Sequence, residues 1–238
     1  MLRNTLRSTI EELLALTLPC YCIGCHRRLR GRRKMICHHC FEELPRYRSE
    51  GDYFNVQKRL AGWLAFTEYQ SSLIFARHNA TRPLIHAIKY QGFPELAQQL
   101  SHHFAVQHLA AGHFVDCTAI VPVPLTPERM KRRGYNQSLY IAQGLSEVYQ
   151  LPIYDHLLYR HSSRATQTRR GREERWQKMQ GNFFLSDLAQ SLDLANERLL
   201  LVDDLLTTGS TLIHSGRSLL EAGIESLSLY TLALDVLE

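Results

Sequence analysis

The amino-acid sequence predicts an α/β protein with a central, mostly parallel sheet, helices on both faces and a small N-terminal metal-binding module. The sheet is predicted by short, unbroken apolar runs at 118–121 and 199–202, which are typical of strands covered on both faces. The module is predicted by two C-x-x-C pairs near the N-terminus. We therefore expect two parts, a helix with a zinc-binding module at 1–45 and a larger α/β domain at 46–238.

The stretch from 199 to 211, L-L-L-V-D-D-L-L-T-T-G-S-T, predicts a strand, a turn and the start of a helix. The strand is expected at 199–202, and the adjacent acids Asp203 and Asp204 stand where it would leave the core. The helix is expected to end before Gly223, because glycine readily adopts the positive φ of a helix C-terminus. In open α/β sheets, ligands bind at the carboxyl ends of the strands.

The turn after this strand has the composition of a phosphate cradle. Glycine lets a backbone approach a ligand closely, and the N–H groups at a helix start point outward unsatisfied. Two carboxylates would repel a phosphate unless they hold sugar hydroxyls or a divalent cation such as Mg²⁺, so the pattern predicts a ribose phosphate. The alternative is a strand followed by a threonine-capped helix with exposed acids. The cradle residues are Thr207, Thr208, Gly209, Ser210 and Thr211.

This stretch resembles the phosphoribosyl pyrophosphate (PRPP) loop of type I phosphoribosyltransferases: an apolar strand, two acids, two spacers and T-T-G-x-T. The resemblance implies the type I phosphoribosyltransferase fold for 46–238. It also implies that Asp203 and Asp204 hold the ribose hydroxyls and that residues 207–211 hold the 5′-phosphate. No G-x-x-x-x-G-K-[ST] or G-x-G-x-x-G occurs, which argues against a P-loop or a dinucleotide-binding fold.

The composition is that of one core with a small appendage. The chain has 238 residues, a net charge of +5 and twelve histidines, a balance that favours polyanionic partners. No apolar run approaches the ~18 residues of a membrane span. Basic residues cluster at 27–34, 129–133 and 160–178.

The first nineteen residues are expected to form an amphipathic helix of a cytoplasmic protein. Glu11 and Glu12 interrupt the apolar region that a signal peptide would need. One face of a helix would instead carry the apolar residues Leu2, Leu6, Ile10, Leu13, Leu14 and Leu18.

The two cysteine pairs, Cys22-x2-Cys25 and Cys37-x2-Cys40, predict a structural zinc site, because four thiolates can surround Zn²⁺ tetrahedrally. Cys20 is an alternative to Cys22, and the neighbouring histidines at 26, 38 and 39 are further alternatives. Disulfides are disfavoured by the missing export signal. The loop between the pairs could contact nucleic-acid phosphates, or it could be a solvated turn; its candidate contacts are Arg30, Arg32 and Arg33.

A second candidate phosphate-binding segment follows the strand at 118–121. Prolines stiffen a turn whose backbone must point at a ligand, and the basic residues 129–133 would offset the charge of a pyrophosphate. A surface loop before a basic helix start is the alternative. The expected pyrophosphate residues are Val123, Pro124, Arg133, Tyr135 and Asn136.

The polar stretch 160–178 is too hydrophilic for the core and long for a connection, which is typical of a lid or a disordered segment. In type I phosphoribosyltransferases a mobile loop at this place closes over PRPP, so the resemblance implies a lid here. Its candidate ligand contacts are Arg164 and Gln167.

The remaining elements are assigned from periodicity and turn residues. We expect a polar connector at 43–59, strands at 63–66, 73–75, 152–159, 182–185 and 226–234, and helices at 82–90, 94–109 and 137–149.

The order of motifs resembles the ComF family of competence-associated, phosphoribosyltransferase-like proteins. The matching segments run from residue 18 to residue 211: L-P-C-Y-C-I-G-C, I-K-Y-Q-G, V-P-V-P-L, R-R-G-Y-N-Q-S, R-A-T-Q-T and V-D-D-L-L-T-T-G-S-T. The extra Cys20 and a heavier basic load in the zinc loop depart from the family pattern. The resemblance implies a cytoplasmic protein that assists the uptake of single-stranded DNA in natural transformation, with DNA-uptake proteins as partners.

Three functions follow as hypotheses. The first is a phosphoribosyltransferase that binds PRPP with Mg²⁺ and transfers the ribose to a nitrogen or oxygen nucleophile, either in competence or as a housekeeping enzyme. The second is a DNA-handling protein, and the third is a non-catalytic PRPP-sensing partner. No residue presents itself as a general base, so the sequence assigns no catalytic residue and no acceptor.

Overall fold

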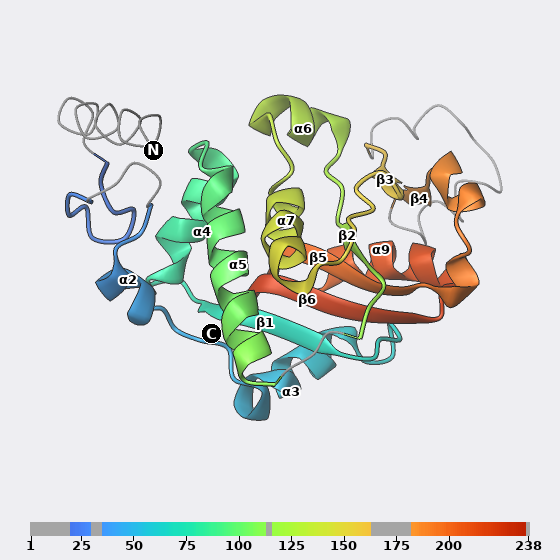
Figure 1. Cartoon of the computed structure of the whole chain (residues 1–238), viewed down its shortest axis with the longest axis horizontal. Coiled ribbons are helices and arrows are strands. Elements are labelled where there is room, and N and C mark those ends of the chain that lie inside the picture. Colours follow the sequence, from blue (N-terminus) through green and yellow to red (C-terminus); the bar gives the residue numbers. More distant parts are fainter. Residues whose placement is uncertain (1–19, 30–34, 113–115, 163–181, 237–238) are drawn as a thin grey trace, which may run out of the picture.

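The protein is built on a four-stranded parallel sheet with the strand order β1-β6-β5-β2 (Figure 1). The computed structural model describes residues 20–29, 35–112, 116–162 and 182–236. The strands are β1 (Tyr69–Phe75), β2 (Ala119–Pro122), β5 (Arg198–Leu206) and β6 (Ser226–Asp235). Because all four run in the same direction, their carboxyl ends meet at one edge of the sheet.

Helices cover both faces of the sheet, as the sequence predicts. Along β5, Leu200 and Val202 pack into one apolar cluster, and Leu199 and Leu201 pack into the other. This alternation follows from the two-residue period of a strand. The first cluster lies under α4 (Thr81–Tyr90), α5 (Pro94–Ala110) and α7 (Gln137–Tyr149), and the second lies under α3 (Ser49–Leu60) and α9 (Ser210–Glu221).

The N-terminal segment packs on the helical layer of α5. Phe41, in the short helix α2 (His38–Glu42), and Leu44 join the first cluster. The guanidinium of Arg46 stacks over Phe41 and Phe104, at 4.6 Å from each ring centre. The cysteine segment is therefore held against the α/β core by apolar and cation–π contacts.

Short elements complete the described chain. They are α6 (Pro127–Arg133), the antiparallel pair β3 (Leu158–Arg160) and β4 (Phe183–Leu185), and two single-turn helices at Asp187–Ser191 and Leu194–Asn196.

The helices predicted at 82–90, 94–109 and 137–149 are confirmed, and Pro94 occupies the first turn of α5. The connector predicted at 43–59 is wrong, because most of it is the helix α3. Val56 and Leu60 give α3 a buried stripe, while the polar residues lie on its outer face. A mostly polar helix resembles a linker in composition, which is why the pattern was misleading.

Two predicted strands also differ. Residues 63–66 form a turn and coil: Leu64 is buried, but Trp63 is 61% exposed and its carbonyl accepts from Arg217 Nε at 2.7 Å. The strand predicted at 152–159 is mostly coil, with one bridge from Ile153 to Ile120 before β3 begins at Leu158. Packing without sheet pairing accounts for the apolar residues at 63–66, whereas at 152–157 packing is joined by the single bridge to β2.

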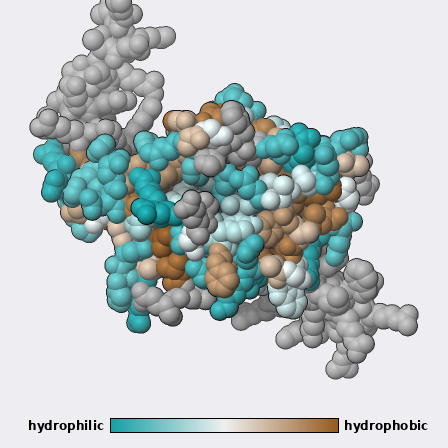
Figure 2. Space-filling view, turned by 90° about the horizontal axis from the view of Figure 1, so that it is seen from below, coloured by the Kyte–Doolittle hydropathy of each residue, from teal (hydrophilic) through white to brown (hydrophobic). Residues whose placement is uncertain are grey.

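None of the described helices is long and apolar enough to span a lipid bilayer. Seen from below, the surface is a mosaic of hydrophilic and hydrophobic patches (Figure 2).

Candidate functional site

The acids Asp203 and Asp204 lie inside β5, near the carboxyl edge of the sheet. The prediction that the strand ends at residue 202 is therefore wrong, because β5 continues to Leu206. Asp203 is 8% exposed and Asp204 is 4% exposed. Pairing with β6 at Asp203 and Leu205 holds this part of the strand extended. Burying two carboxylates is costly unless each has a partner, so their surroundings indicate what the site does.

Asp203 is held by two donors. Ser138 Oγ donates to Asp203 Oδ1 at 3.1 Å, and the N–H of Asp204 donates to the same oxygen at 2.8 Å. Burial and the neighbouring Asp204 charge nevertheless raise the pKa of Asp203 to about 7, against the lowering effect of these hydrogen bonds and of Lys89. Asp203 is thus poised to change its charge near neutral pH.

Asp204 has one partner and one open oxygen. Lys89 Nζ lies 3.1 Å from Oδ1. The other oxygen, Oδ2, is buried and has no hydrogen-bond partner among the described residues. Because an unsatisfied buried carboxylate oxygen is unfavourable, this atom is a place where a hydroxyl or a cation would bind.

The turn after β5 is tight and leads directly into α9. Gly209 has φ +84°, which disfavours any residue with a side chain, and a Cβ there would come within 2.7 Å of Leu60 Cδ2 and force that buried side chain to move. Thr207, Thr208 and Ser210 are exposed. Thr208 Oγ1 accepts from the Ser210 N–H at 3.4 Å, whereas the N-cap residue Gly209 has no side chain to accept from the N–H groups of Thr211 and Leu212. These open N–H groups are available to an anion.

The acids and this turn share a cavity of about 340 Å³ with several basic side chains. The basic residues come from the end of α4, from α6 and from β3, and they outnumber the two carboxylates. Such a cavity is electropositive despite the buried acids, and it suits a ligand that carries both hydroxyls and several phosphates. The polar and charged residues that line it are Lys89, Arg129, Arg132, Arg133, Gln137, Arg160, Asp203, Asp204, Thr207 and Thr211.

Two of the arginines are fixed by neighbouring groups. Arg133 Nη1 donates to Gln137 Oε1, and its guanidinium lies 5.5 Å from the ring centre of Tyr90. Arg160 stacks over Phe183 at 4.6 Å, and burial lowers its pKa, with the charge of Arg129 acting in the same direction. Preorganised guanidinium groups lose little entropy when they bind an anion.

The expected pyrophosphate residues divide into two groups. Val123, Pro124 and Arg133 line the cavity. Tyr135 and Asn136 do not line it: the Tyr135 hydroxyl donates to the Ile88 carbonyl at 2.6 Å, and Asn136 Nδ2 donates to the Val123 carbonyl at 3.1 Å. Asn136 Oδ1 also accepts from the Ser138 N–H at the start of α7. These two side chains shape the walls of the site.

Lys89, Tyr90 and Arg160 line the cavity. The sequence assigned no role to Lys89 and Tyr90, and it placed Arg160 at the start of the expected lid, whereas the structure has it at the end of β3. Lys89 and Tyr90 belong to the I-K-Y-Q-G motif, which was the one signal that could have pointed to them. Arg164 and Gln167 of the expected lid, and Arg30, Arg32 and Arg33 of the zinc loop, lie outside the described residues.

The four cysteines of the predicted zinc site lie together. The sulfur atoms of Cys22, Cys25, Cys37 and Cys40 are all within 4.8 Å of one another. The N–H of Cys37 donates to Cys22 Sγ at 3.3 Å. Burial raises the pKa of Cys22, but backbone N–H groups, led by that of Cys25, outweigh it and lower the pKa to about 7.

This donor set suits a structural zinc ion. Four thiolates can close a tetrahedral site, and N–H···S bonds favour the ionised sulfur that a metal needs. The sequence left Cys20 and Cys22 as alternatives for one ligand. The cluster contains Cys22 and not Cys20.

The comparisons with known proteins agree with this geometry. Residues 67–236 match the family described as phosphoribosyl transferase domain. The chain is 28% identical over 217 residues to competence protein F of Haemophilus influenzae, covering 89% of each chain. It is 24% identical to competence protein ComFC of Bacillus subtilis, covering 89% of this chain and 82% of that protein.

Two further likenesses are more limited. DNA utilization protein YhgH of Escherichia coli is 30% identical over 153 residues, covering 63% of this chain and 65% of that protein. Among solved structures, a glutamine PRPP amidotransferase from Bacillus subtilis is similar with a TM-score of 0.38 and 18% identity, covering 57% of this chain and 26% of that one. From the matched domain and the competence relatives together, the chain belongs to the phosphoribosyl transferase domain family and, within it, to the competence-associated ComF family.

Proposed function

We propose that the protein binds PRPP, or a related ribose phosphate, in the cavity around Asp203 and Asp204. The observation that carries the proposal is the buried, unpartnered Oδ2 of Asp204 in a cavity rimmed by arginines. A ribose hydroxyl would donate to this oxygen. The open N–H groups after Gly209 would take the 5′-phosphate, and Lys89 with the α6 arginines would take the pyrophosphate.

Mg²⁺ fits the same donor set. The oxygens of a carboxylate pair are ligands that Mg²⁺ accepts, and PRPP supplies further phosphate oxygens. When bound, Mg²⁺ would screen the phosphates from the two buried carboxylates. Lys89 already neutralises part of the Asp204 charge, so it would keep the ligand-free site stable.

In the enzyme version of this proposal, the bond between C1 of the ribose and the pyrophosphate oxygen breaks, and the electron pair leaves with pyrophosphate. A nitrogen or oxygen nucleophile then bonds to C1 and loses its proton. Arg129, Arg132 and Arg133 would stabilise the charge that develops on the leaving group. The carboxylates would orient the hydroxyls and stabilise the positive charge that develops on the sugar ring.

The experiment is to mix the protein with PRPP and Mg²⁺, follow binding by calorimetry and measure released pyrophosphate, with and without single-stranded DNA. We expect binding together with release of pyrophosphate. Binding without release under any condition would assign the protein to the class of PRPP-sensing partners. Pyrophosphate release that is the same with and without DNA would favour a housekeeping transferase with another acceptor. Absence of PRPP binding would overturn the proposal.

A second function, cytoplasmic handling of imported single-stranded DNA, is supported by a groove beside the four-cysteine cluster. A cavity of about 440 Å³ is lined by Tyr21, His26, Arg82 and His86 among others. The rings of His86 and Tyr90 lie 5.1 Å apart, and Tyr90 borders the PRPP cavity. Exposed rings interleaved with arginines bind single strands by stacking and by charge.

This function predicts that Arg82→Gln with His86→Ser weakens binding of a labelled oligothymidine roughly tenfold, since one stacking ring contributes about 1–3 kcal/mol. The slope of log affinity against log salt should fall by about 0.7, the share of one phosphate contact. Fluorescence anisotropy at several salt concentrations measures both. The matched control is Phe54→Ser with Lys58→Gln, an exposed ring and cation on α3, and an equal loss in that control would contradict the groove.

A further inference from the structure

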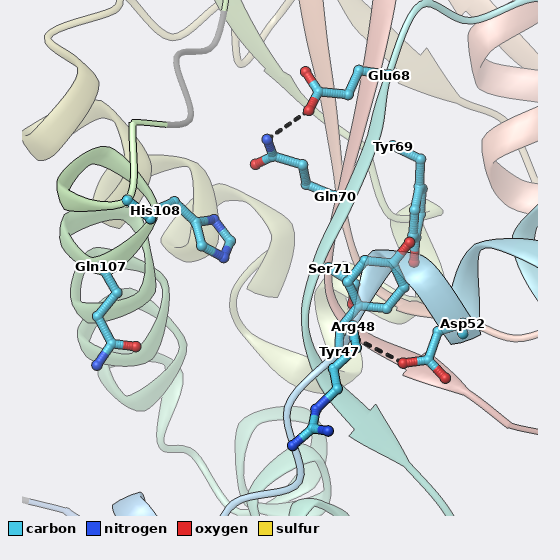
Figure 3. A pocket seen from close by; sticks show the side chains of 11 residues that line it. Tyr47, Arg48, Asp52, Glu68, Tyr69, Gln70, Ser71, Gln107 and His108 are labelled. Atoms are coloured by element: carbon cyan, nitrogen blue, oxygen red, sulfur yellow. Dashed lines mark hydrogen bonds between the residues drawn. The ribbon is translucent and has the colours of Figure 1, made fainter.

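A second cavity, of about 820 Å³, lies away from the phosphate site, where β1 begins (Figure 3). Because β1 starts at Tyr69, this cavity lies at the amino ends of the strands, on the opposite side of the sheet from their carboxyl ends. Its walls are the first residues of β1, the segment that enters α3, and the last turn of α5. The lining residues with polar side chains are Tyr47, Arg48, Asp52, Glu68, Tyr69, Gln70, Ser71, Gln107 and His108.

One wall of the cavity is an open strand edge. β1 is the outermost strand of the sheet, and the segment 45–47 pairs only with its second half. There, Arg46 bridges Leu73 in antiparallel fashion, Tyr47 N–H donates to the Ser72 carbonyl, and Ile74 N–H donates to the Pro45 carbonyl. Among the described strands and bridges, nothing pairs with this side of 69–71.

The backbone groups of this edge are directed toward the cavity. Leu229 N–H donates to the Glu68 carbonyl, so the polar groups of residue 68 face β6. The pairs from Tyr69–Leu229 to Ser71–Thr231 continue this ladder without interruption, so the N–H and C=O groups of Tyr69 and Ser71 face the other side. The alternation shifts only at Ser72, which has no partner residue in the β6 register and whose carbonyl accepts from Tyr47 N–H. An unpaired edge of this kind is a template for another strand unless the protein covers it.

The cavity has room for the side chains of an incoming strand, and its side walls supply polar contacts. His108 projects from α5 toward β1, and the Tyr47 ring stands opposite it, in edge contact with Tyr69 at 5.8 Å (Figure 3). The Tyr47 hydroxyl is buried and has no hydrogen-bond partner among the described residues. An incoming polar group would satisfy it.

The charge of the cavity favours a basic occupant. Asp52 and Glu68 stand on its rim, whereas the Arg48 guanidinium points away from Glu68 and Gln70 (Figure 3). Glu68 Oε1 accepts from Gln70 Nε2 at 2.8 Å, and no hydrogen bond to its other oxygen is found among the described residues, which leaves that oxygen available to a cation. A free polyanion such as DNA is disfavoured here, in contrast to the groove beside the four-cysteine cluster.

We propose that this cavity is a docking site for an extended, basic segment of a partner protein, which adds a strand to the free half of β1. The main-chain hydrogen bonds would come from Tyr69 and Ser71, and a lysine or arginine of the segment would meet Glu68 and Asp52. The segment would continue the antiparallel pairing that residues 45–47 begin. This site lies at the amino ends of the strands, and the cavity around Asp203 and Asp204 lies at their carboxyl ends, so the partner would bind with PRPP present.

The test uses the full chain and a fluorescein-labelled hexapeptide, acetyl-Thr-Val-Lys-Val-Lys-Thr-amide, as a probe of extended basic peptides. We expect saturable binding by anisotropy, and slower hydrogen exchange at the Tyr69 and Ser71 amides in the complex. Ala111→Trp, which fills the cavity from α5, should weaken binding about tenfold or more. Ala110→Trp, an exposed neighbour that does not line the cavity, is the matched control and should leave binding unchanged.

Two further arms decide the class of ligand. A peptide with N-methyl groups on the residues that face β1 should fail to bind, and Asp52→Asn with Glu68→Gln should weaken the unmodified peptide. The proposal is overturned if the N-methylated peptide or free lysine amide binds as well as the probe, which would assign the cavity to a small amine. It is also overturned if no probe binds at millimolar concentration, or if both tryptophan variants bind alike.

Discussion

Replacing Asp203 and Asp204 together by asparagine is expected to abolish the stabilisation of this protein by PRPP. In the wild-type protein, PRPP with Mg²⁺ at a hundred times its Kd should stabilise the fold by about 2.7 kcal/mol, which is a rise in Tm of roughly 5–10 °C. The double variant loses the anionic oxygens that would hold the ribose hydroxyls and Mg²⁺. Differential scanning fluorimetry with and without PRPP measures the effect.

The matched control is Asp187→Asn with Asp193→Asn, two exposed acids outside the cavity, which should keep the full rise in Tm. A double variant of Asp203 and Asp204 that is stabilised by PRPP as much as the wild-type protein would contradict the assignment. Loss of the fold is not expected, because Asn can accept from Ser138 and from the Asp204 N–H as Asp203 does.

The burial of Asp203 also predicts how the unfolding free energy of the protein changes with pH. The pKa of Asp203 is raised from 3.8 to about 7, first by burial and then by the charge of Asp204. Its contribution to stability is therefore complete below the unfolded pKa and is lost as pH rises through about 7. Between pH 5 and 8 the wild-type protein should lose up to about 3 kcal/mol of unfolding free energy that Asp203→Asn does not lose.

Urea unfolding of both proteins at the two pH values measures this difference, and parallel pH profiles would show that the carboxyl is ionised throughout. PRPP binding should show the opposite trend, because the ligand needs the charged carboxylate. Its affinity should rise with pH up to about 7 and then level off.

The second large effect is expected at the cysteine cluster. We expect the four cysteines to hold one zinc ion, so Cys25→Ser with Cys40→Ser should abolish zinc binding and unfold the cysteine segment, because structural zinc supplies about 10–16 kcal/mol of apparent binding free energy in small modules. The Phe41 and Leu44 contacts with α5 would then be lost, which lowers the Tm of the α/β domain as well. Zinc content by atomic absorption, together with the thermal melt, measures both consequences.

Cys20→Ser is the matched control, since Cys20 precedes the cluster without belonging to it. It should retain one zinc ion per chain and the wild-type Tm. Equal zinc loss in both variants would make Cys20 a ligand, and unchanged zinc in the double cysteine variant would remove the assignment of the site.

The sequence by itself determined the features that depend on residues close together in the chain. The unit from β5 through Gly209 to α9, the three amphipathic helices and the cysteine pairs all follow from periodicity, turn residues and spacing within about twenty positions. The apolar run of β5 also indicated correctly that this strand is covered on both faces. These patterns were sufficient for the fold class and for placing the acids toward the carboxyl end of this strand, but they did not show that the strand continues past the acids to Leu206.

The tertiary structure decided what surrounds those acids. Lys89 reaches Asp204 from a helix more than a hundred residues earlier in the chain, and Arg160 enters the cavity from β3. Likewise, α3 supports the turn after β5 because its Leu60 packs against Gly209. The first half of β1 has an open edge because residues 45–47 pair only with the second half. Burial, charge pairing and unpaired edges depend on which distant segments meet, and a local pattern contains no information about that meeting.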